Sequence, residues 1–396
     1  MKSHRNYGRA CLGILVIFLL NGCLPASRPP TPTPITTGPQ PPAPITPTAS
    51  PLENSAATRL AWFYKPPPND ADMLMLAHEF QFFILTHGNE QERNQLLALG
   101  APRPILEYIR FDAIHDPHDC TAQPRRNQAA YEVGDFCRIS SEHPDWFLLN
   151  QNGERISLPY GDQDYVMMDP GNAGWRAFFL QRVEQIQADP NWGGVFLDNV
   201  EVTLAFREND GQLPQAYPDE ASYQNAVQGF LKYLYTGYFQ PNHKLMYANI
   251  VARKNETDWT SYLTWLDGAM HEGWAVDWPN RYRDDAIWEQ QMTLAEQTQA
   301  MGKFIILVSQ GTQDDVELQK FAFASYLLVN QGKAAFRYAA SGNYSEAWTY
   351  ADYNYNLGVP LGPRYKEGDA WYRNYSHGLV MVNPIAHEAM IEVFPK

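Results

Sequence analysis

Short apolar runs alternate with longer amphipathic segments along most of the chain. The amphipathic segments carry apolar residues at helical spacing, and Gly100, Gly302 and Gly332 mark the ends of three of them. The apolar runs between them predict eight strands, at 60–65, 80–86, 104–111, 194–200, 244–250, 267–274, 303–311 and 333–340. Strands separated mostly by helices are typical of parallel sheets joined by crossover helices.

Eight such strands in a chain of this size favour a (β/α)8 TIM barrel, expected over residues 58–343. An open doubly wound sheet is the alternative, but that fold usually carries a glycine-rich first turn, and this sequence has none. After residue 344 the pattern changes to two alternating runs separated by "NPIAHE". These runs predict a β-hairpin or small sheet, a C-terminal β extension over 344–396.

The first 22 residues have the composition of an export signal. Lys2, Arg5 and Arg9 precede the apolar run "ACLGILVIFLL", which is too short to cross a bilayer comfortably. The following "LNGC" resembles the lipobox of bacterial lipoproteins, which implies cleavage before Cys23 and lipidation of that cysteine. An uncleaved anchor and ordinary signal-peptidase cleavage are the alternatives. Lipidation would hold the protein outside the cytoplasm, on the bacterial cell membrane.

A linker is expected over residues 23–57. Its sequence is rich in proline and threonine, and residues 24–51 contain one charged residue and no aromatic one. Such a segment cannot bury a hydrophobic core and is expected to be extended and disordered. It would connect the lipid anchor to the globular body.

The cysteines indicate a disulfide rather than a metal site. Of the four, Cys11 lies in the signal and Cys23 in the lipobox. The remaining pair, Cys120 and Cys137, lies in one polar loop of an exported protein, where a disulfide is expected. A metal site is the alternative because His115 and His118 are nearby.

Charge and motifs exclude several classes of function. The net charge of −14 argues against a nucleic-acid partner, because no basic stripe offsets repulsion by phosphates. The sequence has no phosphate-binding loop, dinucleotide fingerprint or zinc-protease motif, and no serine nucleophile elbow. We therefore expect no cofactor and no metal.

The chemistry of the expected barrel lies at the C-terminal ends of its strands. These ends carry carboxylates, amides and aromatic rings, a set that suits sugar hydroxyls and the apolar faces of sugar rings. The residues expected to bind substrate are Tyr64, Tyr108, Arg110, Asn199, Asn249, His271, Trp274, Gln310 and Arg337. For the tyrosines and the tryptophan, packing in the core is the alternative role.

Glycoside hydrolysis requires one acid that protonates the leaving oxygen and one carboxylate that attacks the anomeric carbon or activates water. Asp198 and Glu272, at the ends of the fourth and sixth strands, are the best-placed pair. Each has a structural alternative: Asp198 as an acceptor or helix cap, and Glu272 as an ion-pair partner. Glu201 and Glu107 are rival acids.

Three segments, "GGVFLDNVE", "DGAMHEGW" and "YNLGVPLGPRY…WYRNYSHGLVMVNP", resemble hypothetical glycosyl hydrolase family fifteen, over about residues 60–395. The resemblance implies a barrel and a glycosidase reaction more strongly than a substrate. The placement of the two acids is similar to that in retaining α-galactosidases and α-glucosidases. That similarity implies Asp198 as nucleophile and Glu272 as acid/base, although those enzymes carry aspartate at the second position.

The sequence thus favours an extracytoplasmic glycoside hydrolase acting on oligo- or polysaccharides. A catalytically idle barrel lipoprotein that binds glycans at the cell surface is the alternative. A deacetylase or another polysaccharide-modifying enzyme is a third possibility, but its usual metal ligands are not apparent in the sequence. The distance between Asp198 and Glu272 discriminates between the first two, because hydrolysis needs both carboxyl groups in one pocket.

Overall fold

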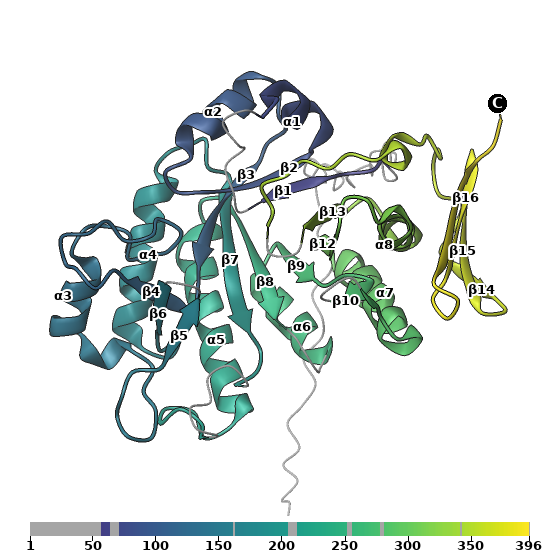
Figure 1. Ribbon diagram of the computed structural model, residues 1–396. Helices are drawn as coiled ribbons and strands as arrows, with labels where there is room; N and C mark the ends of the chain where they lie inside the picture. Colours follow the sequence, from purple (N-terminus) through teal and green to yellow (C-terminus); the bar gives the residue numbers. More distant parts are fainter. Residues whose placement is uncertain are drawn as a thin grey trace, which may run out of the picture. The chain divides into compact units, whose positions relative to one another are not determined.

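The computed structural model describes residues 57–63, 71–160, 163–204, 212–251, 256–277, 281–340 and 343–395 (Figure 1). All of them belong to one compact unit. Within these ranges no helix has the length and apolar character needed to cross a membrane. The expected signal, Cys23, nearly all of the expected linker, and Tyr64 lie outside the described residues.

Eight parallel strands form the centre of the molecule, which confirms the predicted (β/α)8 barrel. Each strand hydrogen-bonds to the next in the order β1-β2-β3-β7-β8-β9-β12-β13. The ring closes where Leu60 pairs with Phe336, whose amide N–H donates to the carbonyl of Arg59 over 2.8 Å. The strands are β1 (Ala61–Phe63), β2 (Phe82–Thr86), β3 (Ile105–Arg110), β7 (Gly194–Glu201), β8 (Leu245–Val251), β9 (Gly268–Glu272), β12 (Phe304–Gly311) and β13 (Ala334–Ala340).

Helices flank the barrel strands (Figure 1). They are α1 (Met73–Glu79), α2 (Glu90–Ala98), α4 (Ala173–Gln187), α5 (Glu220–Leu234), α6 (Glu256–Tyr262), α7 (Asp285–Ala300) and α8 (Val316–Val329). Four begin at a side-chain cap, because Asp72, Asn172, Asp219 and Asp315 each accept a backbone N–H from the first turn. The sequence predicts Asp169 as the cap of α4, with a role in the site as the alternative. The cap prediction is wrong, because Asn172 holds that position.

The core has two layers because strand side chains alternate between the two faces of the sheet. Phe196 of β7 belongs to a cluster inside the barrel, with Leu106, Met270 and Ile306 from other strands. Residues on the opposite face of β7, including Leu197, pack in the larger cluster between strands and helices. Side chains therefore fill the interior of the barrel, and a site can form only at its mouth, at the C-terminal ends of the strands.

An insertion between β3 and α4 adds a small antiparallel sheet. Its strands are β4 (Ala113–Asp116), β5 (Ser157–Tyr160) and β6 (Gln163–Met167), in the order β4-β6-β5, and it also contains α3 (Asp135–Glu142). The expected Cys120–Cys137 disulfide is present here, with Cα atoms 5.7 Å apart. Across the described residues no cluster of three His, Cys, Asp or Glu side chains could hold a metal ion.

Loss of this disulfide should destabilise the protein. The bond closes a loop of 17 residues, and the loop-entropy model assigns roughly 3 kcal/mol to such a loop. The double variant Cys120→Ser/Cys137→Ser should therefore lose about that much free energy of unfolding, measured by urea denaturation. A reducing agent should destabilise the wild type by a similar amount and leave the double variant unchanged. Equal stability of both proteins under oxidising conditions would contradict this prediction.

The predicted C-terminal β extension is a four-stranded antiparallel sheet beside α8 (Figure 1). Its strands are β14 (Tyr365–Glu367), β15 (Ala370–Tyr375), β16 (Gly378–Asn383) and β17 (Glu388–Val393). One face packs on α8, where Tyr375 and Arg373 both donate to the carbonyl of Leu327. Arg364, just before β14, forms ion pairs with Glu289 and Glu296 of α7. A short hairpin, β10 (Val276–Asp277) and β11 (Arg281–Tyr282), lies between β9 and α7.

Candidate active site

A β-bulge directly follows Asp198 in β7. The pairing of β7 with β8 shifts register between Leu197 and Val200, and Asn199 has a φ of 58°. A non-glycine residue at positive φ is uncommon, and asparagine tolerates it better than most residues. The extra residue changes the phase of the strand, so that Phe196 belongs to the inner cluster and Val200 to the outer one. Asp198 occupies the last inward position before the bulge.

One amide brings Asp198 and Glu272 together. Nδ2 of Asn249, on β8, donates to Oδ1 of Asp198 over 3.0 Å and to Oε2 of Glu272 over 2.9 Å. The two accepting oxygens therefore lie no more than about 6 Å apart, the sum of the two hydrogen-bond lengths. The two carboxyl groups thus come from β7 and β9, on either side of β8, which carries Asn249.

Two tyrosines complete the hydrogen bonding of this pair. The hydroxyl of Tyr108, on β3, donates to Oδ2 of Asp198 over 2.5 Å. The hydroxyl of Tyr344, four residues after β13, donates to Oε1 of Glu272 over 2.6 Å and itself accepts from the amide of Gln310 on β12. Each of the four carboxyl oxygens thus accepts a hydrogen bond. The resulting chain of polar groups crosses the mouth of the barrel.

Arg110 places a positive charge beside Asp198. Arg110 is the neighbour of Asp198 in the β3–β7 register, and its Nε pairs with Asp112 over 2.9 Å. Its guanidinium lies over the ring of Tyr165, with Cζ 4.2 Å from the ring centroid. The Asp112 carboxylate and the ring hold the guanidinium in place, and its charge favours ionised Asp198.

The two carboxyl groups differ electrostatically. Burial, and next the charge of Asp198, raise the pKa of Glu272 to about 7, against the opposing hydrogen bonds from Tyr344 and Asn249. Burial also raises the pKa of Asp198, but hydrogen bonds from Tyr108 and Asn249 and the charge of Arg110 oppose it. Burial raises the pKa values of Tyr108 and Tyr344 well above the usual tyrosine value, so both remain protonated donors. Glu272 is thus the carboxyl group that can hold a proton near neutral pH.

The model of Hypothetical glycosyl hydrolase family 15 matches residues 105–379, more than half of the chain. The chain belongs to this family. The matched span contains the whole polar chain described above, from Tyr108 to Tyr344. No match to a curated protein was found.

Several solved glycoside hydrolases resemble this chain in structure. The glycoside hydrolase domain of PelA from Pseudomonas aeruginosa is 13% identical, with a TM-score of 0.49 over 73% of this chain and 96% of that domain. The maltogenic alpha-amylase AmyB from Thermotoga neapolitana is 11% identical, with a TM-score of 0.45 over 84% of this chain and 86% of its own. The alpha-galactosidase TtGalA from Thermus thermophilus is 11% identical, with a TM-score of 0.45 over 84% of this chain and 67% of its own.

Three of the expected substrate-binding residues lie away from the carboxyl pair. Trp274 is fully buried against α8, where its indole N–H donates to the carbonyl of Ala322, so the structure does not support contact with substrate. His271 alternates with Glu272 on β9 and faces the outer layer, its ring against Trp259 and Trp274. Burial lowers its pKa to about 4, so the imidazole is neutral at neutral pH.

Arg337 is the third residue that the structure places differently from the expectation. Its guanidinium is buried over the rings of Trp62 and Phe80 and donates to the carbonyls of Tyr344 and Glu346. It therefore fixes the segment that carries the Tyr344 hydroxyl rather than a sugar. Tyr108, Arg110, Asn199, Asn249 and Gln310 lie at the carboxyl pair or next to it in the chain, and substrate contact by them stays a prediction.

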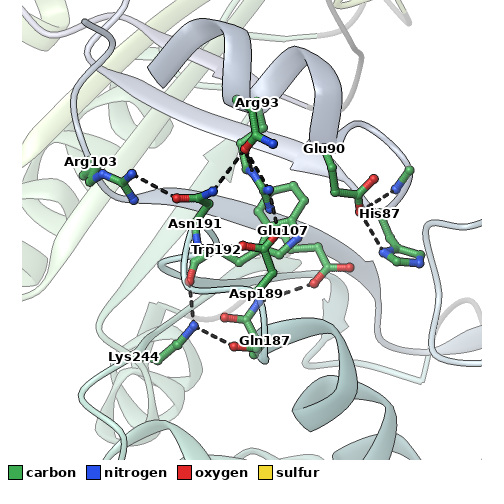
Figure 2. A network of polar contacts seen from close by, with 12 residues as sticks. His87, Glu90, Arg93, Arg103, Glu107, Gln187, Asp189, Asn191, Trp192 and Lys244 are labelled. Carbon is green, nitrogen blue, oxygen red and sulfur yellow. Dashed lines mark hydrogen bonds and ion pairs between the residues drawn. The ribbon is translucent and has the colours of Figure 1, made fainter. Parts of the chain in front are cut away.

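Of the two rival acids, Glu107 lies apart from the carboxyl pair. Figure 2 shows Glu107 in a separate polar network outside the barrel, with Arg93, Asp189 and Lys244 nearby. Gln187 of α4 donates to its Oε2 over 3.3 Å, and burial raises its pKa well above the usual value. Glu201 is the last residue of β7, beyond the bulge, and its backbone carbonyl accepts from Tyr262. The Asn249 amide, whose two N–H groups serve Asp198 and Glu272, binds neither rival.

Proposed function

We propose that this protein is an extracytoplasmic glycoside hydrolase that cleaves O-glycosidic bonds of oligo- or polysaccharides, with Asp198 as nucleophile and Glu272 as general acid/base. The observation that carries the proposal is the pair of hydrogen bonds from Asn249, which holds both carboxyl groups in one cluster. The raised pKa of Glu272 supports the acid role. Membership of a glycosyl hydrolase family supports the reaction class.

In the first step the carboxylate of Asp198 attacks the anomeric carbon of the bound sugar. As the new carbon–oxygen bond forms, the bond to the leaving oxygen breaks and that oxygen takes the proton of Glu272. Ionised Glu272 is stabilised by the hydrogen bonds from Tyr344 and Asn249. The product of this step is a covalent glycosyl–Asp198 ester.

In the second step Glu272 acts as a base. It removes a proton from water, whose oxygen attacks the anomeric carbon and displaces the carboxylate of Asp198. The enzyme returns to its starting state, and the sugar leaves with the anomeric configuration of the substrate. The two oxygens that accept from Asn249 lie within about 6 Å of each other, which keeps both carboxyl groups within reach of one glycosidic bond. Retention of configuration is proposed from the similar placement of the two acids in retaining α-galactosidases and α-glucosidases.

The proposal is tested by assaying the purified protein on aryl glycosides and polysaccharides. We expect turnover of at least one substrate, and 1H NMR of the first-formed product should show retained configuration. An inverted product would assign Asp198 to the activation of water instead. Binding of polysaccharides with no turnover on any member of the panel would support the alternative, a non-catalytic glycan-binding barrel.

We also propose that the protein is anchored to the bacterial cell membrane through a lipid on Cys23. The proposal rests on the basic and apolar segments that precede "LNGC". Cys23→Ser should release the protein from the membrane fraction and abolish labelling with a radioactive fatty acid. Wild-type protein that stays in the membrane without incorporating label would contradict lipidation. Cys11→Ser is the matched control and should leave both measurements unchanged.

A further inference from the structure

Exposed apolar side chains gather on the outer face of the C-terminal sheet. Four residues that are direct cross-strand neighbours, Tyr365, Tyr372, Met381 and Met390, form a row across β14, β15, β16 and β17. Tyr365 and Met390 are each 36% exposed, although they sit in regular strands. The two tyrosine rings stack, with centroids 5.8 Å apart and planes at 23°. We call these four residues the Tyr–Met row.

A second row lies beside the first on the same face. Leu361, which is 66% exposed, donates its backbone N–H to Asn374 of β15, and Asn374 is the cross-strand neighbour of Leu379. Leu379 in turn pairs with Glu392 of β17. The alternate residues of these strands point to the other face, where the sheet packs on α8 (Figure 1). The outer face therefore presents apolar and aromatic groups flanked by amide and carboxylate groups.

We propose that this outer face binds a polysaccharide chain at a site separate from the barrel mouth; the class of ligand rests on the proposed function. Aromatic rings can pack against the apolar faces of sugar rings, as Tyr365 and Tyr372 would do. The exposed side chains of Asn374, Glu388 and Glu392 can hydrogen-bond to sugar hydroxyls. A row that crosses all four strands fits an extended chain better than a single sugar.

The size and charge of the face argue against a protein partner. Three strands of six residues and one of three, about 4.8 Å apart, cover roughly 350 Å², less than half of what each partner contributes to a stable interface. The charged side chains among the outward positions are carboxylates, those of Glu367, Glu388 and Glu392. In a dimer formed through this face, the carboxylates of one copy would lie against those of the other and repel them. The same negative charges would repel anionic lipid and nucleic acid. A neutral polysaccharide chain is narrow enough for this small face and is not repelled by its carboxylates.

The test is affinity electrophoresis in gels containing amylose, xylan, galactomannan, cellulose or chitin derivatives. The protein carries Glu272→Gln so that no polysaccharide is consumed. We expect at least one polysaccharide to retard it, and Tyr365→Ala/Tyr372→Ala to weaken that binding by about tenfold, the scale of two lost aromatic contacts. Met390→Gln, at the other end of the row, should weaken it less. Tyr233→Ala, which removes a comparably exposed tyrosine from α5, is the control and should change nothing.

Three outcomes overturn the proposal: no retardation by any polysaccharide, equal retardation of the double variant, or a dimeric protein that the double variant converts to a monomer. Light scattering after size exclusion distinguishes the last outcome, and circular dichroism verifies folding. With Glu272 restored, the double variant should hydrolyse soluble aryl glycosides like the wild type. If the protein hydrolyses no substrate, the binding test on the outer face can still be carried out. If the outer face binds no polysaccharide, the proposed hydrolysis at the barrel mouth is not affected.

Discussion

Asp198→Asn and Glu272→Gln should each lower kcat/KM on a polysaccharide substrate by about 10³-fold or more, since one removes the nucleophile and the other the acid. Both replacements are nearly isosteric. The hydroxyls of Tyr108 and Tyr344, which donate to these carboxyl groups, can turn and accept from the new amide N–H groups. Each variant keeps the volume of the side chain and an oxygen that can accept from Asn249, so folding should be preserved.

The leaving group distinguishes the two roles. A dinitrophenyl glycoside needs no proton to depart, so Glu272→Gln should retain much of the first step on that substrate. Asp198→Asn should lose the reaction on every substrate, because no nucleophile remains. Kinetics on dinitrophenyl and alkyl glycosides, compared for the two variants, measure this difference.

Glu107→Gln is the matched control. It makes the same carboxyl-to-amide replacement at a buried position, but in the network of Figure 2 outside the barrel. Turnover should stay near the wild-type value. If Asp198→Asn and Glu272→Gln also kept wild-type turnover, the assignment would be wrong, and Glu201 would become the next residue to test.

The barrel was predictable because burial alone decides most of it. Strands buried on both sides require apolar runs, helices that cover them require apolar residues at helical spacing, and both patterns are visible in the sequence. Asp198 stands out for the same reason, as a carboxylate that ends an apolar run. The position of Glu272 on β9 follows from the same alternation of elements.

Side-chain direction at the strand ends was harder to predict. Strand alternation places His271 opposite to Glu272, but Trp274 would point inward if β9 continued. β9 instead ends at Glu272, and Gly273 and Ala275 both have positive φ, so the chain turns and buries the indole against α8. The bulge at Asn199 was equally hard to predict, because no local sequence pattern indicates it.

Tyr344 was missed because its contact is long-range. It lies 72 residues from Glu272 in the sequence, in a segment expected to begin the C-terminal extension. Arg337, which was expected to bind sugar, instead donates to the backbone carbonyl of Tyr344 and so positions this tyrosine. The signal available in the sequence was proximity, because Tyr344 follows the end of the eighth strand by four residues.

The alkaline limb of the kcat/KM profile should fall near pH 7, and Tyr344→Phe should move it to higher pH. Glu272 must be protonated to act as acid, so activity is lost as the pH rises through its pKa of about 7. The hydrogen bond from Tyr344 favours the ionised form and lowers this pKa. Its removal should raise the pKa by about one unit, the scale of a hydrogen bond to a charged group.

Tyr108, which donates to Asp198, should affect the acid limb of the kcat/KM profile. The hydrogen bond from Tyr108 lowers the pKa of Asp198, which must be ionised to attack, so Tyr108→Phe should shift the acid limb to higher pH. Tyr375→Phe removes a hydroxyl that donates to Leu327 in the C-terminal sheet and should leave both limbs in place. Titration of 13C-labelled glutamate side chains by NMR measures the pKa of Glu272 without turnover. If Tyr344→Phe left that pKa unchanged, or lowered it, the hydrogen bond to Oε1 would not control protonation of the acid.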